Sequence, residues 1–129
     1  MAATRPHASV VWFAVAADAV LVLLFVLIGR GSHDEGFTVH GTLVTWWPFL
    51  VGLAVGWLIT MAWRRPLGVL MPGIVIWAAT VGVGMLVRTL SGQGIALAFV
   101  IVAAVTLAVF LLGWRTVAKV VSLRARQPS

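Results

Sequence analysis

The chain of 129 residues has no cysteine, only three acidic residues, and 9% charged residues in all. The absence of cysteine excludes disulfides, thiolate metal sites and covalently attached haem, and it leaves the redox compartment open. Soluble domains carry roughly 25% charged residues. A soluble chain of this length could not hide its 62% of apolar residues behind so few polar groups. The composition therefore predicts a membrane protein.

Motifs of the common catalytic classes are also missing. The sequence has no glycine-rich phosphate loop, no His-Glu-x-x-His and no nucleophile elbow. No histidine lies inside a predicted helix, which argues against a haem buried in a bundle. The basic residues that give a net charge of +6 are scattered at the ends of apolar runs and form no single face. We therefore expect no enzyme activity, no cofactor and no nucleic-acid partner.

Four apolar runs occupy most of the chain. Each is close to the length of about 20 residues that crosses a hydrocarbon core of roughly 30 Å. The first run is too long for the apolar part of a signal peptide, so we expect it to be retained. Short connections make successive helices antiparallel neighbours. The sequence predicts one domain over residues 1–129, an all-α four-helix transmembrane bundle with helices at about 8–28, 46–62, 67–87 and 94–114 and a basic tail at 115–129.

Lysine and arginine are distributed unevenly between the two predicted sides. Seven lie on the side of both termini and the second connection, and two, Arg30 and Arg88, lie on the other side. The positive-inside rule then predicts a multi-pass protein of the cell membrane with both termini in the cytoplasm. The four basic residues of the tail are expected to bind anionic lipid headgroups or to act as a stop-transfer flank. These residues are Arg115, Lys119, Arg124 and Arg126.

Asp18 lies at the midpoint of the first run, and an acid at that depth marks a functional or packing site. A helical rise of about 1.5 Å per residue places Trp77, Thr80 and Thr106 at similar depth, and no basic side chain at that level. Burial without a cation favours a neutral carboxyl group. These residues form the predicted intramembrane polar site. Asp18 either carries a proton or binds a substrate there, or it bonds across helices as a packing contact.

Three smaller features complete the candidate residues. Gly52 and Gly56 form a Gly-xxx-Gly motif, which predicts close helix packing. Pro48 and Pro66 are expected in the first turns of the second and third helices, where proline is tolerated. Pro72 also falls in the first turns of the third helix, where it could kink the helix. An outer-face polar cluster of Arg30, His33 and Arg88 is predicted. The neighbouring Asp34, Glu35 and His40 could bind a metal, but mixed loops of this kind are usually solvated, so no metal site is expected.

The order of several short motifs resembles a family of small four-helix membrane proteins of bacteria and archaea, domain-of-unknown-function family 3054. The resemblance covers about residues 10 to 116 and implies an integral membrane protein with no assigned activity. Small multidrug transporters offer only an analogy, because their first-helix acid is a glutamate. The motifs are Asp18, Gly29-Arg30-Gly31-Ser32-His33, Trp47-Pro48-Phe49, Gly56-Trp57, Trp77, Arg88, Phe99 and Trp114-Arg115.

Two functions stay open at this point. The first is a small integral membrane protein of unknown activity that packs with itself, as a homo-oligomer, or with a larger membrane-protein partner. The alternative is a small proton- or cation-coupled transporter that uses Asp18. A water-accessible cavity that reaches Asp18 would favour the transporter.

Overall fold

The computed structural model describes residues 7–32 and 38–126. Within them the chain forms four main helices and has four segments long and apolar enough to cross a membrane. The third of these segments, Val69–Leu90, joins a short irregular helical stretch to the third main helix. The prediction of an all-α bundle with four candidate membrane spans is therefore confirmed. The helices are α1 (Ala8–Ser32), α2 (Val39–Thr60), α3 (Val75–Leu90) and α4 (Leu97–Arg126).

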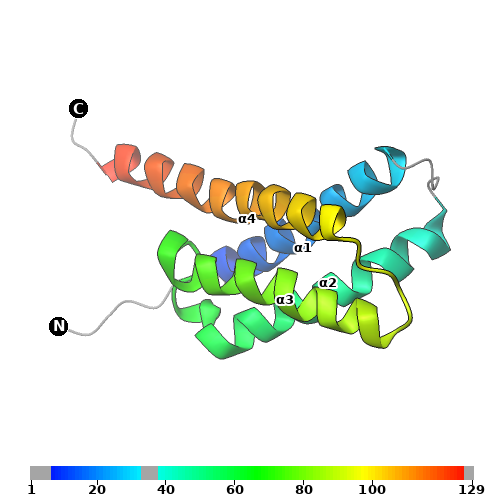
Figure 1. The fold of residues 1–129 in the computed structure, drawn as a ribbon. Helices are drawn as coiled ribbons and strands as arrows, with labels where there is room; N and C mark the ends of the chain where they lie inside the picture. Colours follow the sequence, from blue (N-terminus) through cyan, green and yellow to red (C-terminus); the bar gives the residue numbers. More distant parts are fainter. Residues whose placement is uncertain (1–6, 33–37, 127–129) are drawn as a thin grey trace.

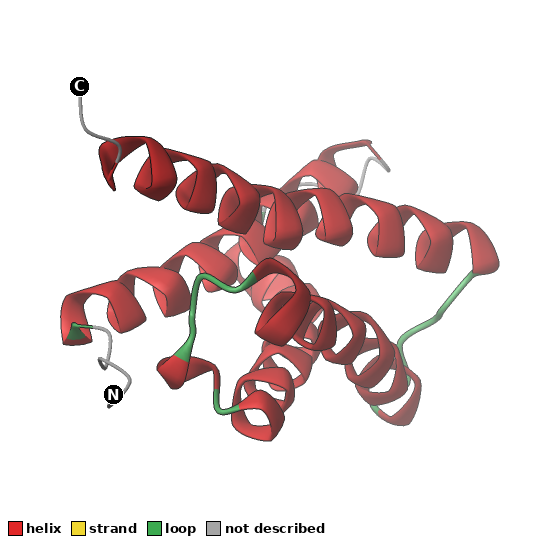
Figure 2. Cartoon of the chain, turned by 90° about the vertical axis from the view of Figure 1, so that its left-hand side faces the viewer, coloured by secondary structure: helices red, strands yellow, loops and turns green. Residues whose placement is uncertain are grey.

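The helices run up and down in sequence (Figure 1). The start of α1, the end of α4 and the connection between α2 and α3 lie toward one end of the bundle, and the other two connections lie toward the opposite end. Figure 2 shows that helices and their connecting loops make up the described chain. This arrangement places the end of α1, the start of α2, the end of α3 and the start of α4 together, and it brings the first helix beside the last. We call this the outer end, as in the orientation expected from the sequence.

The closest helix pair is α2 with α3, and two glycines allow it. A Cβ atom at Gly52 would lie 2.6 Å from the carbonyl oxygen of Ala79, and one at Gly56 would lie 2.8 Å from the Cα of Ile76. Real Cβ atoms do not approach other atoms this closely, so only glycine fits at either position. The Gly-xxx-Gly motif thus packs two helices of the same chain, α2 and α3.

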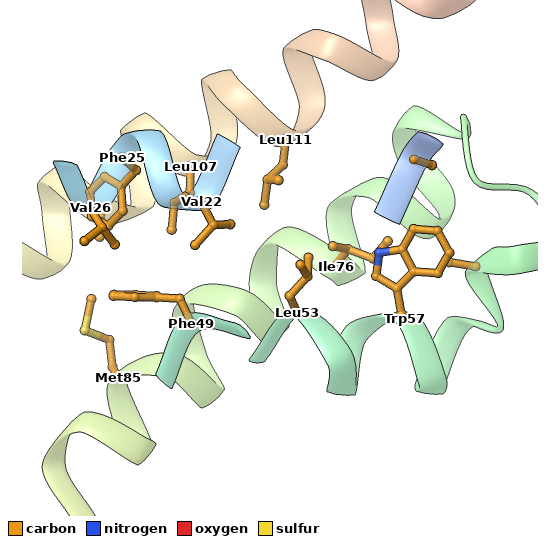
Figure 3. Packing of buried hydrophobic residues seen from close by; sticks show 13 residues of the cluster. Val22, Phe25, Val26, Phe49, Leu53, Trp57, Ile76, Met85, Leu107 and Leu111 are labelled. Atoms are coloured by element: carbon orange, nitrogen blue, oxygen red, sulfur yellow. The ribbon is translucent and has the colours of Figure 1, made fainter. Parts of the chain in front are cut away.

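The apolar core lies between the four helices and receives side chains from each of them (Figure 3). Three phenylalanines cluster in the half of the core toward the α1–α2 and α3–α4 connections. The ring centroids of Phe25 and Phe49 are 5.5 Å apart in an edge-to-face contact, and that of Phe99 lies 6.1 Å from Phe25. These rings join α1, α2 and α4. Aromatic pairs of this kind contribute stability in addition to that gained by burying their apolar surface.

Helix α2 begins at Val39, seven residues earlier than the sequence indicated. Thr38 is its N-cap, and the Oγ1 atom of Thr38 accepts a hydrogen bond of 3.0 Å from the Gly41 amide. Pro48 therefore lies inside the helix and not in its first turn. A proline has no N–H, so the Val44 carbonyl loses its helical donor. Gln93 replaces this donor, because its Nε2 atom donates to the Val44 oxygen at 3.1 Å.

The region between α2 and α3 also differs from the prediction. Regular α3 begins at Val75, not at residue 67, after a short 3₁₀ turn (Ala62–Arg64) and a π-type segment (Val69–Ile74). Met71 has extended backbone angles (φ −139°, ψ 119°) within that segment. The ring of a following proline disfavours helical geometry at the preceding residue. Pro72 accordingly interrupts the third span instead of bending a continuous helix.

The predicted tail at residues 115–129 is helical as far as Arg126, because α4 continues without a break past Trp114. Between Trp114 and Arg126 the sequence has no glycine or proline, and it contains good helix formers such as alanine, leucine, lysine and arginine. A charged residue can end an apolar run without ending a helix. The prediction that the tail begins at Arg115 is therefore wrong for the described part of this segment.

Candidate functional site

The buried polar site centres on an ion pair between Asp18 of α1 and Arg115 of α4. Both side chains have zero exposure. The Nη1 atom of Arg115 donates to Oδ1 of Asp18 at 2.8 Å, and Nη2 donates to Oδ2 at 2.7 Å. This two-point geometry is the strongest form of an arginine–carboxylate contact. The prediction that no basic side chain lies at the level of Asp18 is wrong, and so is the assignment of Arg115 to lipid headgroups.

The length of α4 explains why the pair forms. Asp18 lies ten residues after the first residue of α1, and Arg115 lies eleven residues before the last residue of α4. Both distances correspond to about 15–17 Å along the helix axis. Because α1 begins and α4 ends toward the same end of the bundle, the two side chains reach the same level. The sequence predicted that the fourth helix ends at Trp114, and this placed Arg115 at the membrane surface. Helix α4 instead continues to Arg126.

Two tryptophans complete the surroundings of the carboxylate. The indole Nε1 of Trp57, near the end of α2, donates to Oδ2 at 2.8 Å, and that of Trp114 donates to Oδ1 at the same distance. The two carboxylate oxygens thus accept four N–H hydrogen bonds. An ionised carboxylate has about four acceptor positions, whereas a protonated one must use an oxygen as a donor. The four donors occupy these acceptor positions, and Arg115 supplies the cation that the sequence did not place beside Asp18. The premise of a carboxyl group buried without a cation is therefore wrong.

The remaining donors of Arg115 bind backbone oxygens. Its Nε atom donates to the carbonyl of Pro66 at 3.0 Å, and Nη1 also donates to the Leu111 carbonyl at 3.1 Å. The guanidinium carbon lies 4.8 Å from the centre of the Trp114 ring. Pro66 is thus a buried turn residue that accepts from Arg115, and not the first residue of the third helix. The site joins α1, α2, α4 and the connection between α2 and α3.

The other residues of the predicted polar site do not donate to Asp18 in the described chain. The Nε1 atom of Trp77 donates to the Ala104 carbonyl at 2.8 Å, which joins α3 to α4. Thr80 is buried, and its hydroxyl donates to the Ile76 carbonyl within its own helix at 2.7 Å. Thr106 is half-buried on α4. Of the predicted set, Asp18 alone belongs to the ion-paired site.

The two outer arginines have separate described contacts. Arg30 donates through Nη1 to the Thr45 hydroxyl at 3.2 Å. Arg88 donates through Nη1 to Oε1 of Gln93 at 3.0 Å and through Nη2 to the Gly94 carbonyl at 2.8 Å, and its guanidinium lies 4.7 Å from the centre of the Phe99 ring. His33, Asp34 and Glu35 lie outside the described residues.

Lys119, Arg124 and His40 are at the surface. Lys119 and Arg124 are exposed on the last turns of α4, and Arg126 is its last residue. His40 is exposed in the first turn of α2. Of the residues predicted to meet lipid headgroups, Arg115 is thus buried in the bundle, whereas Lys119 and Arg124 are exposed.

Comparison with known proteins places this site in a family. The chain matches the model of a protein family of unknown function, DUF3054, over residues 15–118. The chain belongs to this family. The family resemblance found in the sequence is thus confirmed, and the matched segment of this DUF3054 protein contains all four side chains that form the buried site. Searches of curated proteins and of solved structures gave no match.

A signal for the missed partners was present in the motifs that carry the family resemblance. Trp57, Trp114 and Arg115 of this DUF3054 protein stand among those motifs together with Asp18. Four residues able to form an ion pair and two charge-assisted hydrogen bonds were therefore already in one set. Because the sequence indicated a surface charge at Arg115, this residue was not paired with Asp18.

Proposed function

We propose that this protein is a non-enzymatic integral membrane protein that acts by packing with itself or with a larger membrane partner. In this proposal Asp18 holds the bundle together and does not carry protons or cations. One observation carries the proposal: the buried carboxylate of Asp18 already accepts four hydrogen bonds, two of them from a buried guanidinium.

The saturated carboxylate argues against the alternative, a carrier that uses Asp18. A proton or cation that bound Asp18 would have to displace at least one of the four N–H donors. It would also leave Arg115 as a buried cation without its counter-charge, which is strongly unfavourable. A carrier of this kind would need to separate α1 from α4 in each cycle. The tight contacts of both side chains with three parts of the chain support a static role instead.

The outer faces of the helices support a role in association. Only 17% of the most apolar 18-residue window of α4 is buried within the chain, against 28–33% for the other three spans. Its uncovered face includes Val102, Val105 and Val109, which are 55%, 61% and 63% exposed. Helix α4 is thus the span with the largest share of surface left for lipid or for another helix.

The proposal places the protein in the cell membrane with both termini in the cytoplasm. Once the buried Arg115 is left out, six basic residues remain on the side of the termini and two on the other. This bias still favours the same orientation. Lys119, Arg124 and Arg126 then lie where anionic headgroups of the cytoplasmic leaflet would meet them. A reporter fused after Ser129 should be active only in its cytoplasmic form, and activity on the outer side would contradict the orientation.

Site-specific photo-crosslinking in native membranes tests the association. A photoreactive residue at the exposed Val105 should give one or a few discrete crosslinked protein bands, either the chain with itself or with a single partner. The matched control is Leu107, which is fully buried on the same helix and should give crosslinks only within the chain. If exposed positions on all four helices give only lipid adducts, association is wrong. A proton flux in proteoliposomes of the native chain would establish the carrier instead, provided that a folded Asp18→Asn/Arg115→Gln variant lacks this flux.

A further inference from the structure

A groove of about 360 Å³ opens between the outer ends of α1 and α2, away from the buried ion pair. We propose that this groove binds one acyl chain of an anionic phospholipid, whose phosphate group lies at Arg30. The proposal does not depend on the proposed function. The groove is lined by Leu23, Leu27, Thr38, Val39, Thr42, Leu43 and Trp46.

The lining of the groove suits a hydrocarbon chain. Five of the seven residues are apolar, and the two threonines lie in the N-cap and first turn of α2, toward the outer end of the helix. The apolar wall therefore continues from that end along α1 to Leu23. Because both helices are candidate membrane spans, lipid is the apolar molecule that always surrounds this groove. A lipid tail would run along the wall with its headgroup at the outer end.

Arg30 and the N-terminus of α2 lie together at the end of the groove where a headgroup would lie. The guanidinium of Arg30 lies directly against Gly41 in the first turn of α2, where a Cβ atom would collide with it. It is held there by the Thr45 hydroxyl, which in turn donates to the Gly41 carbonyl at 3.0 Å. The N-terminus of α2 adds its partial positive charge at the same place. An arginine beside a helix N-terminus favours a phosphate over a neutral group.

Trp46 gives a further reason to expect a polar acceptor in this region. It lines the groove, and its indole Nε1 atom is buried with no hydrogen-bond partner in the described chain. A donor without an acceptor is costly inside a membrane. The ester carbonyls of a glycerophospholipid lie between the phosphate and the acyl chains, at the depth between Arg30 and the apolar wall, and are hydrogen-bond acceptors.

Native mass spectrometry of the full chain in mild detergent tests the proposal. The probes are phosphatidylglycerol and phosphatidylcholine with identical acyl chains, added separately. We expect one tightly retained phosphatidylglycerol and weaker retention of phosphatidylcholine. Arg30→Gln should lower the retention of phosphatidylglycerol about five-fold, the effect of roughly one basic residue near a charged lipid. Arg65→Gln, an equal charge change on the exposed turn at the opposite end, should leave retention unchanged.

A second pair of variants tests the groove itself. Thr42→Phe places a ring into the groove and should reduce retention of both lipids, whereas Leu86→Phe at an exposed position of α3 should not. Thermal stability in detergent identifies variants that fail to fold, and for those the lipid comparison is made on the native chain. Equal retention of the two lipids by the native chain overturns the proposal. So does unchanged retention in folded Arg30→Gln and Thr42→Phe, or a crosslink that shows a second copy of the chain in the groove.

Discussion

Removing one partner of the buried ion pair should harm the protein more than removing both. Asp18→Asn keeps the size of the side chain and one acceptor oxygen, but it leaves the guanidinium of Arg115 buried without an anion. Breaking a buried pair in this way typically costs about 3–5 kcal/mol. Arg115→Gln should cost a similar amount, since it leaves the carboxylate with only two indole donors.

The double variant Asp18→Asn/Arg115→Gln carries no buried charge. Its loss is limited to weakened hydrogen bonds, about 1–3 kcal/mol. The two single costs would sum to roughly 6–10 kcal/mol, so the double-mutant cycle should show a coupling of several kcal/mol. Reversible unfolding in mixed micelles of denaturing and mild detergent measures these free energies. If a single variant does not accumulate folded protein while the double variant does, the two side chains are also shown to be coupled.

Two results would refute this reasoning. The first is an Asp18→Asn variant as stable as the native protein, because it would mean that Arg115 does not need the charge of Asp18. The second is a double variant whose cost equals the sum of the single costs, because it would mean that the side chains act independently.

Three further variants test packing contacts described above. Trp57→Phe replaces the indole by a smaller aromatic ring and removes one donor to Asp18. It should cost at least about 0.6–2 kcal/mol in the same unfolding assay, and no loss at all would contradict the bond. Gly52→Ala should destabilise by about 1–3 kcal/mol because its Cβ meets α3, whereas Gly82→Ala, which meets open space, should not. Gln93→Ala should cost about 1 kcal/mol or more, because it leaves the Val44 carbonyl without a donor and removes an acceptor of Arg88. Adding Pro48→Ala should restore part of the stability by returning a backbone donor to Val44. No rescue at all would mean that the contact with Val44 contributes nothing.

The number and order of the helices could be predicted because they depend on local sequence. Each apolar run is long enough to span a bilayer, and the short connections leave little choice of neighbour. Helix ends were harder to predict. The first residues of α2 include His40 and two threonines, so the apolar run appeared to start later than the helix. The cap at Thr38 defines the start of α2, and hydropathy does not report it.

The partner of Asp18 could not be predicted from depth alone. The position of a residue across the membrane was counted from the end of its apolar run. Arg115 directly follows the fourth run, so this count places it at the membrane surface. Its position inside the bundle depends on the continuation of α4 to Arg126 and on the contact with α1, and the second is a long-range property of the fold. The polarity of Asp18 was visible in the sequence, whereas the set of its donors needed the tertiary arrangement.

The ion pair joins residues that are separated by 97 positions in the chain. Synthesis proceeds at about 5–20 residues per second, so the carboxylate of α1 enters the membrane roughly 5–20 s before its arginine is made. During that time Asp18 has no counter-charge, and a chain that stops before α4 never acquires one. Asp18 in the first helix therefore gains its counter-charge only when the last helix is complete. A truncated chain would expose an uncompensated acid to any protease that recognises polar groups in the membrane.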